Sequence, residues 1–112
     1  MIETIVLNYL KTKMNVDVVM EYPTKATSTF LLLEKVGGGQ QEKYLSNASF
    51  TIQSYAPSLA ECAKLNDQVV NCIKQLDELQ EISKVEVDSS YNFTDPSTKQ
   101  YRYQALFDIV YY

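Results

Sequence analysis

One amphipathic segment, residues 57–79, constrains the possible folds most strongly. Its apolar side chains recur every three or four residues, a spacing that places them on one face of an α-helix. Pro57 suits the first turn of such a helix or the position just before it. The predicted buried stripe consists of Leu59, Cys62, Asn66, Val69, Ile73 and Leu76. A helix with one long apolar face must pack on a second layer of structure.

The segments on both sides of this helix alternate between apolar and polar residues with a period of two, which is typical of β-strands. A shorter amphipathic segment at residues 2–13 predicts an N-terminal helix. We expect strands at residues 16–22, 29–36, 44–55, 82–91 and 100–112. The predicted order is therefore α-β-β-β-α-β-β. It indicates an α+β fold in which a mostly antiparallel five-stranded sheet carries a long crossover helix and a short N-terminal helix.

Two segments between the predicted strands have the composition of turns. Gly37, Gly38 and Gly39 are followed by Gln40 and Gln41, and this run predicts a flexible polar hairpin tip. Residues 94–98 (TDPST) combine a proline with residues that cap bends, so they predict the turn of a closing hairpin. The 112 residues form one ordinary domain, residues 1–112, with no internal repeat.

The chain is acidic, with a net charge of −4 and a pI of about 4.7. Residues 60–88 hold seven acids against three lysines, so this stretch carries the whole net charge. Tight nucleic-acid binding by one copy is disfavoured, because the sequence has no basic patch to release counterions from a phosphate backbone. An acidic surface would instead repel DNA.

No run of residues approaches the ~20 apolar positions that a membrane span requires. The first residues alternate apolar with polar side chains and lack the continuous apolar core of a signal peptide. We therefore expect synthesis in the cytosol and no membrane partner.

The sequence offers little for catalysis. Histidine is absent, and the motifs of hydrolases, phosphate-binding loops and zinc peptidases are absent too. Cys62 and Cys72 would lie about 15 Å apart on one helix, too far for a disulfide within the chain. Asp77 and Glu81 form a carboxylate pair at helical spacing, which we interpret as a surface charge cluster. We expect no enzyme activity, no cofactor and no metal site.

Tyrosine is abundant, with nine copies and no tryptophan. Tyr101, Tyr103, Tyr111 and Tyr112 lie in or next to the last predicted strand. Tyrosine combines an apolar face with a polar hydroxyl, and this suits contact surfaces between proteins. Aromatic residues could also fill the core, but alternation prevents Tyr111 and Tyr112 from both being buried on one side of a sheet. We expect one of these two tyrosines at a subunit interface.

The order of these motifs resembles the tail-terminator, or tail-completion, proteins of long-tailed bacteriophages and prophages of Gram-positive bacteria. The resemblance spans almost the whole chain. It is strongest at the strand-to-helix junction of residues 53–65 (QSYAPSLAECAKL) and in the segment Tyr101–Gln104 (YRYQ). The other contributing segments are EYP (residues 21–23), LLLEKVGGG (residues 31–39) and DPSTKQYRYQALFDIVY (residues 95–111).

This resemblance implies a ring-forming subunit, commonly a hexamer, that caps the finished tail tube and stops its polymerisation. Its partners would be further copies of itself, the tail-tube protein and the head connector. DNA would pass through the ring without specific binding. The expected location is the tail neck of the virion, after assembly in the cytoplasm of the bacterial host. The resemblance transfers no catalytic residues.

Two hypotheses about contact residues follow. The segment from Gly37 to Gln41 would contact the neighbouring ring or tube, together with the tyrosines named above. Acidic side chains would line a channel that lets DNA slide, although a solvated outer helix face explains them equally well. The channel candidates are Glu61, Asp67, Glu78, Glu86 and Asp88.

Other functions remain open at this point. The nearest alternative is another neck component, such as a head-closure or connector protein. A small-ligand-binding or regulatory α+β module is a further alternative, and it would require a pocket with convergent polar groups.

Overall fold

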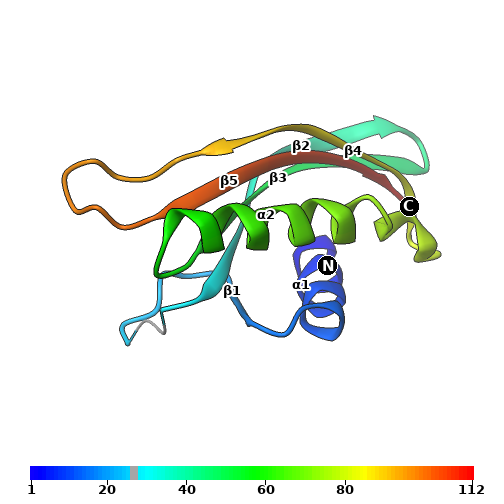
Figure 1. Ribbon diagram of the computed structural model, residues 1–112. Coiled ribbons are helices and arrows are strands. Elements are labelled where there is room, and N and C mark those ends of the chain that lie inside the picture. Colours follow the sequence, from blue (N-terminus) through cyan, green and yellow to red (C-terminus); the bar gives the residue numbers. More distant parts are fainter. Residues whose placement is uncertain (26–27) are drawn as a thin grey trace.

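The computed structural model describes residues 1–25 and 28–112, and the side chains of residues 40–42 lie outside the description. Five strands form one mixed sheet in the order β1-β2-β3-β5-β4, with two α-helices and one short 3₁₀-helix (Figure 1). The α+β class and the predicted order of elements are confirmed. The elements are α1 (Ile2–Lys13), β1 (Asp17–Val19), β2 (Phe30–Glu42), β3 (Leu45–Tyr55), α2 (Leu59–Ile73), η1 (Leu76–Glu78), β4 (Ile82–Asn92) and β5 (Arg102–Tyr111).

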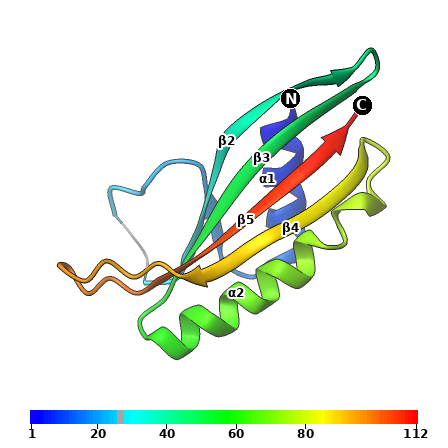
Figure 2. The same cartoon turned by 90° about the horizontal axis from the view of Figure 1, so that it is seen from above.

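Most neighbouring strands are antiparallel, and only β1 runs parallel to β2. Strand β5 lies between β3 and β4 and is antiparallel to both, so β3 and β4 are parallel to each other. Parallel strands need a long crossover connection, and α2 provides it. Seen from above, α2 lies beside β4 while α1 lies under the middle strands (Figure 2).

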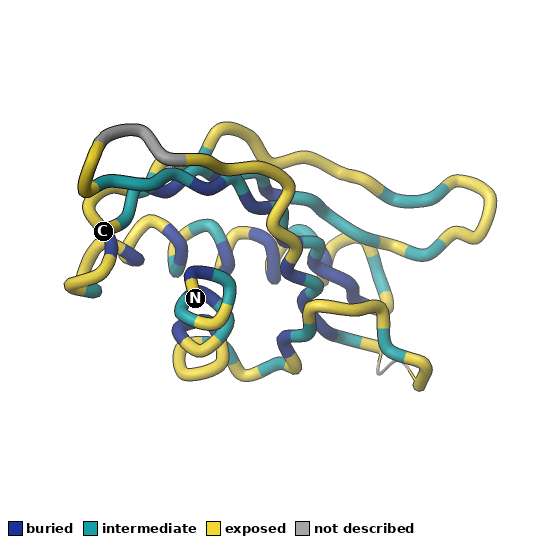
Figure 3. The backbone as a smooth tube through the Cα atoms, turned by 180° about the vertical axis from the view of Figure 1, so that it is seen from behind, coloured by how far each residue is buried: buried dark blue, intermediate teal, exposed yellow. Residues whose placement is uncertain are grey.

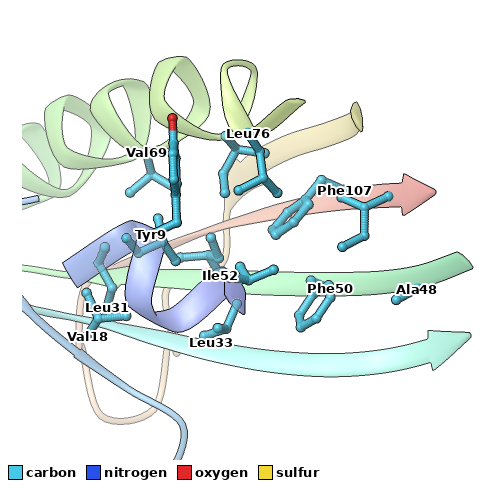
Figure 4. Packing of buried hydrophobic residues seen from close by; sticks show 14 of the residues in the cluster. Tyr9, Val18, Leu31, Leu33, Ala48, Phe50, Ile52, Val69, Leu76 and Phe107 are labelled. Carbon is cyan, nitrogen blue, oxygen red and sulfur yellow. The ribbon is translucent and has the colours of Figure 1, made fainter. Parts of the chain in front are cut away.

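Both helices cover the same face of the sheet, so the molecule has two layers (Figure 1). Buried residues gather where the sheet faces the helices, whereas the hairpins are exposed (Figure 3). The core is apolar and includes the stacked rings of Phe50 and Phe107, whose centroids are 5.5 Å apart. Figure 4 shows these rings below α2, together with side chains from α1, β1 and β2. We call the opposite face of the sheet the outer face, and none of the helices in the described residues covers it.

Ser58 is the N-cap residue of helix α2. The Ser58 hydroxyl accepts a hydrogen bond from the Glu61 backbone N–H at 3.2 Å, and it also lies 3.2 Å from the Glu61 carboxylate. The helix ends at Ile73, earlier than the predicted end at residue 79, and η1 follows. The spacing from Ile73 to Leu76 fits a 3₁₀ turn as well as an α-helix, and both side chains are buried.

The prediction of a flexible hairpin tip at the three glycines is wrong. Strand β2 continues through them to Glu42, and the β2–β3 turn consists of Lys43 and Tyr44. Gly38 pairs with Ala48 and has a φ of 156°. A Cβ atom at Gly38 would lie only 2.7 Å from the backbone oxygen of Asn47, so glycine permits a close approach of the two strands here.

The register of β4 changes at a β-bulge between Val87 and Ser89. Val87 pairs with Phe107 on the helix-covered face, whereas Tyr91 pairs with Gln104 on the outer face. Simple alternation places Tyr91 on the same side as Val87, and this prediction is wrong. A bulge adds one residue to a strand and thereby reverses the side to which later residues point.

Candidate functional site

The outer face is mostly polar in its middle. Strands β3 and β5 run side by side there, and their paired residues are half-buried. Because directly opposed residues point to the same side of a sheet, the register assigns these side chains. The middle of the outer face consists of Asn47, Ser49, Thr51 and Gln53 from β3 and of Gln104, Leu106, Asp108 and Val110 from β5.

Hydrogen bonds connect side chains of three strands at one end of this face. Gln53 donates through Nε2 to Oε1 of Gln104 at 3.0 Å, and Gln104 donates through Nε2 to the Tyr91 hydroxyl at 2.6 Å. The Tyr55 hydroxyl donates to Oε1 of Gln53 at 2.6 Å and accepts from Nη1 of Arg102 at 3.2 Å. Each glutamine is thus held by its amide oxygen and its amide nitrogen.

Arg102 connects the two ends of this series of contacts through Phe93. Its Nε donates to the backbone oxygen of Phe93 at 2.7 Å, and its guanidinium carbon lies 4.6 Å from the centroid of the Phe93 ring. Phe93 in turn meets Tyr91 edge-on, with centroids 5.9 Å apart. We call this closed set the outer-face network. Its members are Gln53, Tyr55, Tyr91, Phe93, Arg102 and Gln104.

An aromatic cluster supports the network at the end of the sheet. Tyr55 stacks on Phe30 with centroids 4.4 Å apart, and Tyr22 meets both rings edge-on at 5.8 Å. The amide of Gln100 donates to the Tyr22 hydroxyl. This contact ties the β1–β2 connection to the segment between β4 and β5.

That segment, residues 93–101, projects beyond the sheet, and we call it the arm (Figure 1). Local hydrogen bonds order it. Asp95 accepts from the backbone N–H and the hydroxyl of Ser97 at 2.9 and 2.7 Å, and these bonds lower the pKa of its carboxyl group. Phe93 and Tyr101 are exposed on the arm. An ordered projection with exposed aromatic rings is suited to contact another molecule.

Acidic side chains gather on the outer face beyond the network. Glu86 pairs with Asp108 across β4 and β5, and Asp108 accepts a hydrogen bond from the Ser49 hydroxyl. A hydrogen bond with Asp108, burial and the nearby charges raise the pKa of Asp88. The two carboxyl groups therefore lie close enough to disfavour having both ionised.

The predicted channel-lining residues do not lie on one surface. Glu61, Asp67 and Glu78 are exposed in the helical layer, and Glu78 forms a 3.3 Å ion pair with Lys13. Glu86 and Asp88 lie on the outer face, on the other side of the sheet. One face of a two-layer molecule cannot present both groups, so at most one of them faces a common channel.

The predicted interface tyrosines are also dispersed. Tyr101 is exposed on the arm, Tyr103 is half-buried, and Tyr111 packs against the core. Tyr112 is 70% exposed at the end of the chain, so alternation correctly separates it from Tyr111.

The glycine segment also lies away from the arm, near the β2–β3 turn at the far end of the sheet (Figure 2). Gly37, Gly38 and Gly39 are exposed strand residues there. The backbone of Gln40 and Gln41 belongs to β2, and their side chains lie outside the described ones. The glycines and the tyrosines therefore do not form a single contact surface.

A groove of about 450 Å³ lies between α1 and α2, lined by Tyr9, Lys13, Asn71 and Cys72 among others. The Tyr9 hydroxyl donates to the backbone oxygen of Gln75 at 3.2 Å. Burial and the nearby Glu78 carboxylate raise the pKa of Tyr9 to about 12, and burial raises the pKa of Cys72. Both groups are therefore protonated at neutral pH, which makes the thiol a poor nucleophile.

Within residues 1–25 and 28–112, no cluster of three or more histidine, cysteine or acidic side chains could hold a metal ion. The helices described in the same residues are too short or too polar to cross a membrane. Models of known protein families do not match the chain, and curated protein sequences do not match it either.

Proposed function

We propose that this chain is a non-catalytic structural subunit of the neck of a long-tailed phage, with the role of a tail terminator. One observation carries the proposal. The two segments that most resemble that family lie on paired strands, with Gln53 opposite Gln104 and Tyr55 opposite Arg102. Four side chains from these segments belong to the outer-face network. Gln53, Arg102 and Gln104 are half-buried on the outer face, whereas Tyr55 is buried beside them.

The composition of this surface supports assembly as its task. Tyrosine and arginine are enriched among the residues that dominate protein–protein binding energy. Tyr91 is 42% exposed and Phe93 is 39% exposed, while hydrogen bonds and ring contacts already hold both side chains in place. A partner that binds here orders few additional rotamers, which lowers the entropic cost of association.

In the proposed role, several copies, commonly six, close into a ring at the end of the tail tube. The ring ends polymerisation of the tail-tube protein and presents a surface to the head connector. DNA passes through the centre without specific binding, because the chain has a net charge of −4 and repels the phosphate backbone.

Loss of the protein from a phage that encodes it tests this role. We expect tails of abnormal, variable length in electron micrographs and no infectious particles. Supplying the natural chain from a plasmid should restore normal tails, and a Lys74→Gln chain, changed at an exposed position at the end of α2, should restore them equally well. Purified protein mixed with tail-tube protein should form caps at tube ends.

Another neck component is the second candidate, because an assembly surface of this kind suits a connector too. The same micrographs separate the two roles. Free tails of normal length beside unjoined, DNA-filled heads would show a connector and contradict the terminator. Normal infectious particles without the protein would contradict both.

A further inference from the structure

From the arrangement of charge along the outer face, we infer that two copies of this chain pair face to face, with Arg102 of one copy opposite Asp108 of the second. This pairing concerns the free protein and does not depend on the proposed function. It would cover the one face of the sheet that the helices leave open.

The outer face has charges of opposite sign at its two ends. Arg102 lies at the end near the arm, with Lys99 close by in sequence. Glu86, Asp88 and Asp108 lie at the other end beside one cation, Lys84, so that end has an excess of negative charge. Asp108 lies six positions after Arg102 on an extended strand, which corresponds to about 20 Å. This separation exceeds the Debye length of about 8 Å at physiological salt, so the two ends act as separate charges on an approaching partner.

A two-fold axis through the outer face would place the positively charged end of one copy opposite the negatively charged end of the other. If the axis passes between Gln104 and Leu106, two antiparallel β5 strands place Arg102 opposite Asp108 twice, once at each end. A contact of this type is isologous, since the same patch of both copies is self-complementary. Leu106 and Thr51 then lie at the centre of the contact, with Glu34 of β2 opposite Thr51, and Arg102 and Asp108 lie towards its two ends.

The local electrostatics of a single copy favour such a partner. A hydrogen bond with Asp108 raises the pKa of Asp88 most, followed by burial and by repulsion from the Asp108 and Glu86 carboxylates. A guanidinium from a second copy would relieve this repulsion. Among the described residues, the hydrogen bonds of Arg102 use Nε and Nη1, so Nη2 can donate to a carboxylate of a second copy.

The geometry of both layers also permits the contact. Two sheets stack face to face at about 10 Å when side chains of moderate size line both faces. Most side chains of β3 and β5 in the middle of the outer face are of moderate size and half-buried, with the exposed Glu34 of β2 opposite Thr51 and the exposed Tyr91 of β4 opposite Gln104. The arm projects at one end of the strands, so it reaches past the edge of the partner rather than blocking the approach (Figure 2).

Light scattering coupled to size-exclusion chromatography tests the pairing across protein concentrations. The natural chain should be a dimer that weakens as salt rises. In a dimer of either variant, Arg102→Glu or Asp108→Lys, two residues of like charge face each other at both ends of the contact. Each variant alone should therefore raise the dissociation constant of the dimer ~10-fold or more. An equimolar mixture of the two variants should form dimers again, because every opposed pair then has opposite signs.

Lys64→Glu is the matched control, since it reverses an exposed charge within α2 in the helical layer and should leave the dimer unchanged. Circular dichroism should show that each variant is folded. If Asp108→Lys does not fold, the double variant Glu86→Lys with Asp88→Lys replaces it, because both residues are exposed.

Three results would overturn the pairing. They are a natural chain that stays monomeric at all concentrations, a dimer that neither charge reversal weakens, and a mixture of variants that does not reassociate. A larger ring that forms equally well with either charge-reversal variant would also refute the face-to-face dimer. It would not contradict the proposed tail function.

Discussion

Two buried polar atoms stand out among individual residues. The hydroxyl of Ser54 and the Oδ1 atom of Asn66 are buried without a hydrogen-bond partner in the described part of the chain. Ser54 is fully buried on the helix-covered face of β3, and Asn66 is 2% exposed in α2. Such groups lose their bonds to water on folding and gain nothing in return. Asn66 was placed in the buried stripe from the sequence, but its missing partner could not be foreseen.

We predict that Ser54→Ala is neutral or stabilises the protein by up to about 1 kcal/mol, because it removes an unsatisfied hydroxyl and leaves the packing intact. Ser49→Ala is the control on the same strand. It deletes a hydroxyl that donates to Asp108, so it should lower the free energy of unfolding. Urea unfolding measures both changes, and a clear loss of stability in Ser54→Ala would contradict the prediction.

Tyr9 gives the protein a dependence on alkaline pH. Its pKa rises from 10.0 to about 12 in the fold, so the folded chain holds the proton after the unfolded chain has released it. Stability from this residue is complete below pH 10 and is lost as pH rises from 10 towards 12. Tyr9→Phe should be less stable at pH 8 by about 1 kcal/mol, because the bond to Gln75 is missing.

The difference in unfolding free energy between the natural chain and Tyr9→Phe should then shrink above pH 10. Urea unfolding at pH 8, 9, 10 and 11 measures it. A difference that stays constant over this range would show that the Tyr9 proton is not held by the fold.

Among the elements, β2 differs most from its prediction. A run of three glycines normally signals a turn, yet these three pair with Ser49, Ala48 and Asn47 on β3. The partner strand decides this outcome, since the backbone of β3 approaches Gly38 too closely for a side chain.

Gly38→Ala should therefore destabilise the chain by about 1–3 kcal/mol, because it combines an unfavourable φ with a close contact. Gly37→Ala is the matched control. Its Cβ would lie 3.8 Å from the nearest atom of Ser49, which is ordinary contact, so its effect should stay within about 0.5 kcal/mol. Thermal unfolding of the two variants measures the difference, and equal effects would contradict this account of Gly38.

At the scale of the whole molecule, two hairpins extend the long axis to 45 Å against 25 Å for the others. The arm is tied to the remainder mainly through the outer-face network and through the bond between Gln100 and Tyr22. Tyr22 also packs edge-on against Phe30 and Tyr55, so this one side chain links the β1–β2 connection, the sheet and the arm.

Tyr22→Ala should loosen the arm without unfolding the sheet. We expect faster hydrogen exchange of the Phe93 and Lys99 amides, which bond to Arg102 and Asp95, and little change in β3. Tyr44→Ala is the control, since Tyr44 is 76% exposed at the β2–β3 turn and far from the arm. Unchanged exchange in the arm would show that local bonds alone hold it.

The sequence by itself determined the elements whose signals are local. Helix α1, the start of α2 next to Pro57, and the alternating core residues of β3 and β5 follow from patterns two to four residues apart along the chain. Those patterns also predicted that Tyr111 and Tyr112 point to opposite sides.

Only the tertiary structure decided how distant segments meet. The place of β5 between β3 and β4, the bulge that turns Tyr91 outward, and the separation of Glu61 from Glu86 onto opposite faces all depend on strand pairing. The outer-face network could not be predicted for the same reason, although both segments that supply most of it, residues 53–55 and residues 101–104, had been singled out from the sequence. Strand register depends on partner strands about fifty residues away, as for Gln53 and Gln104. The alternation of apolar and polar residues within one strand does not identify those partners.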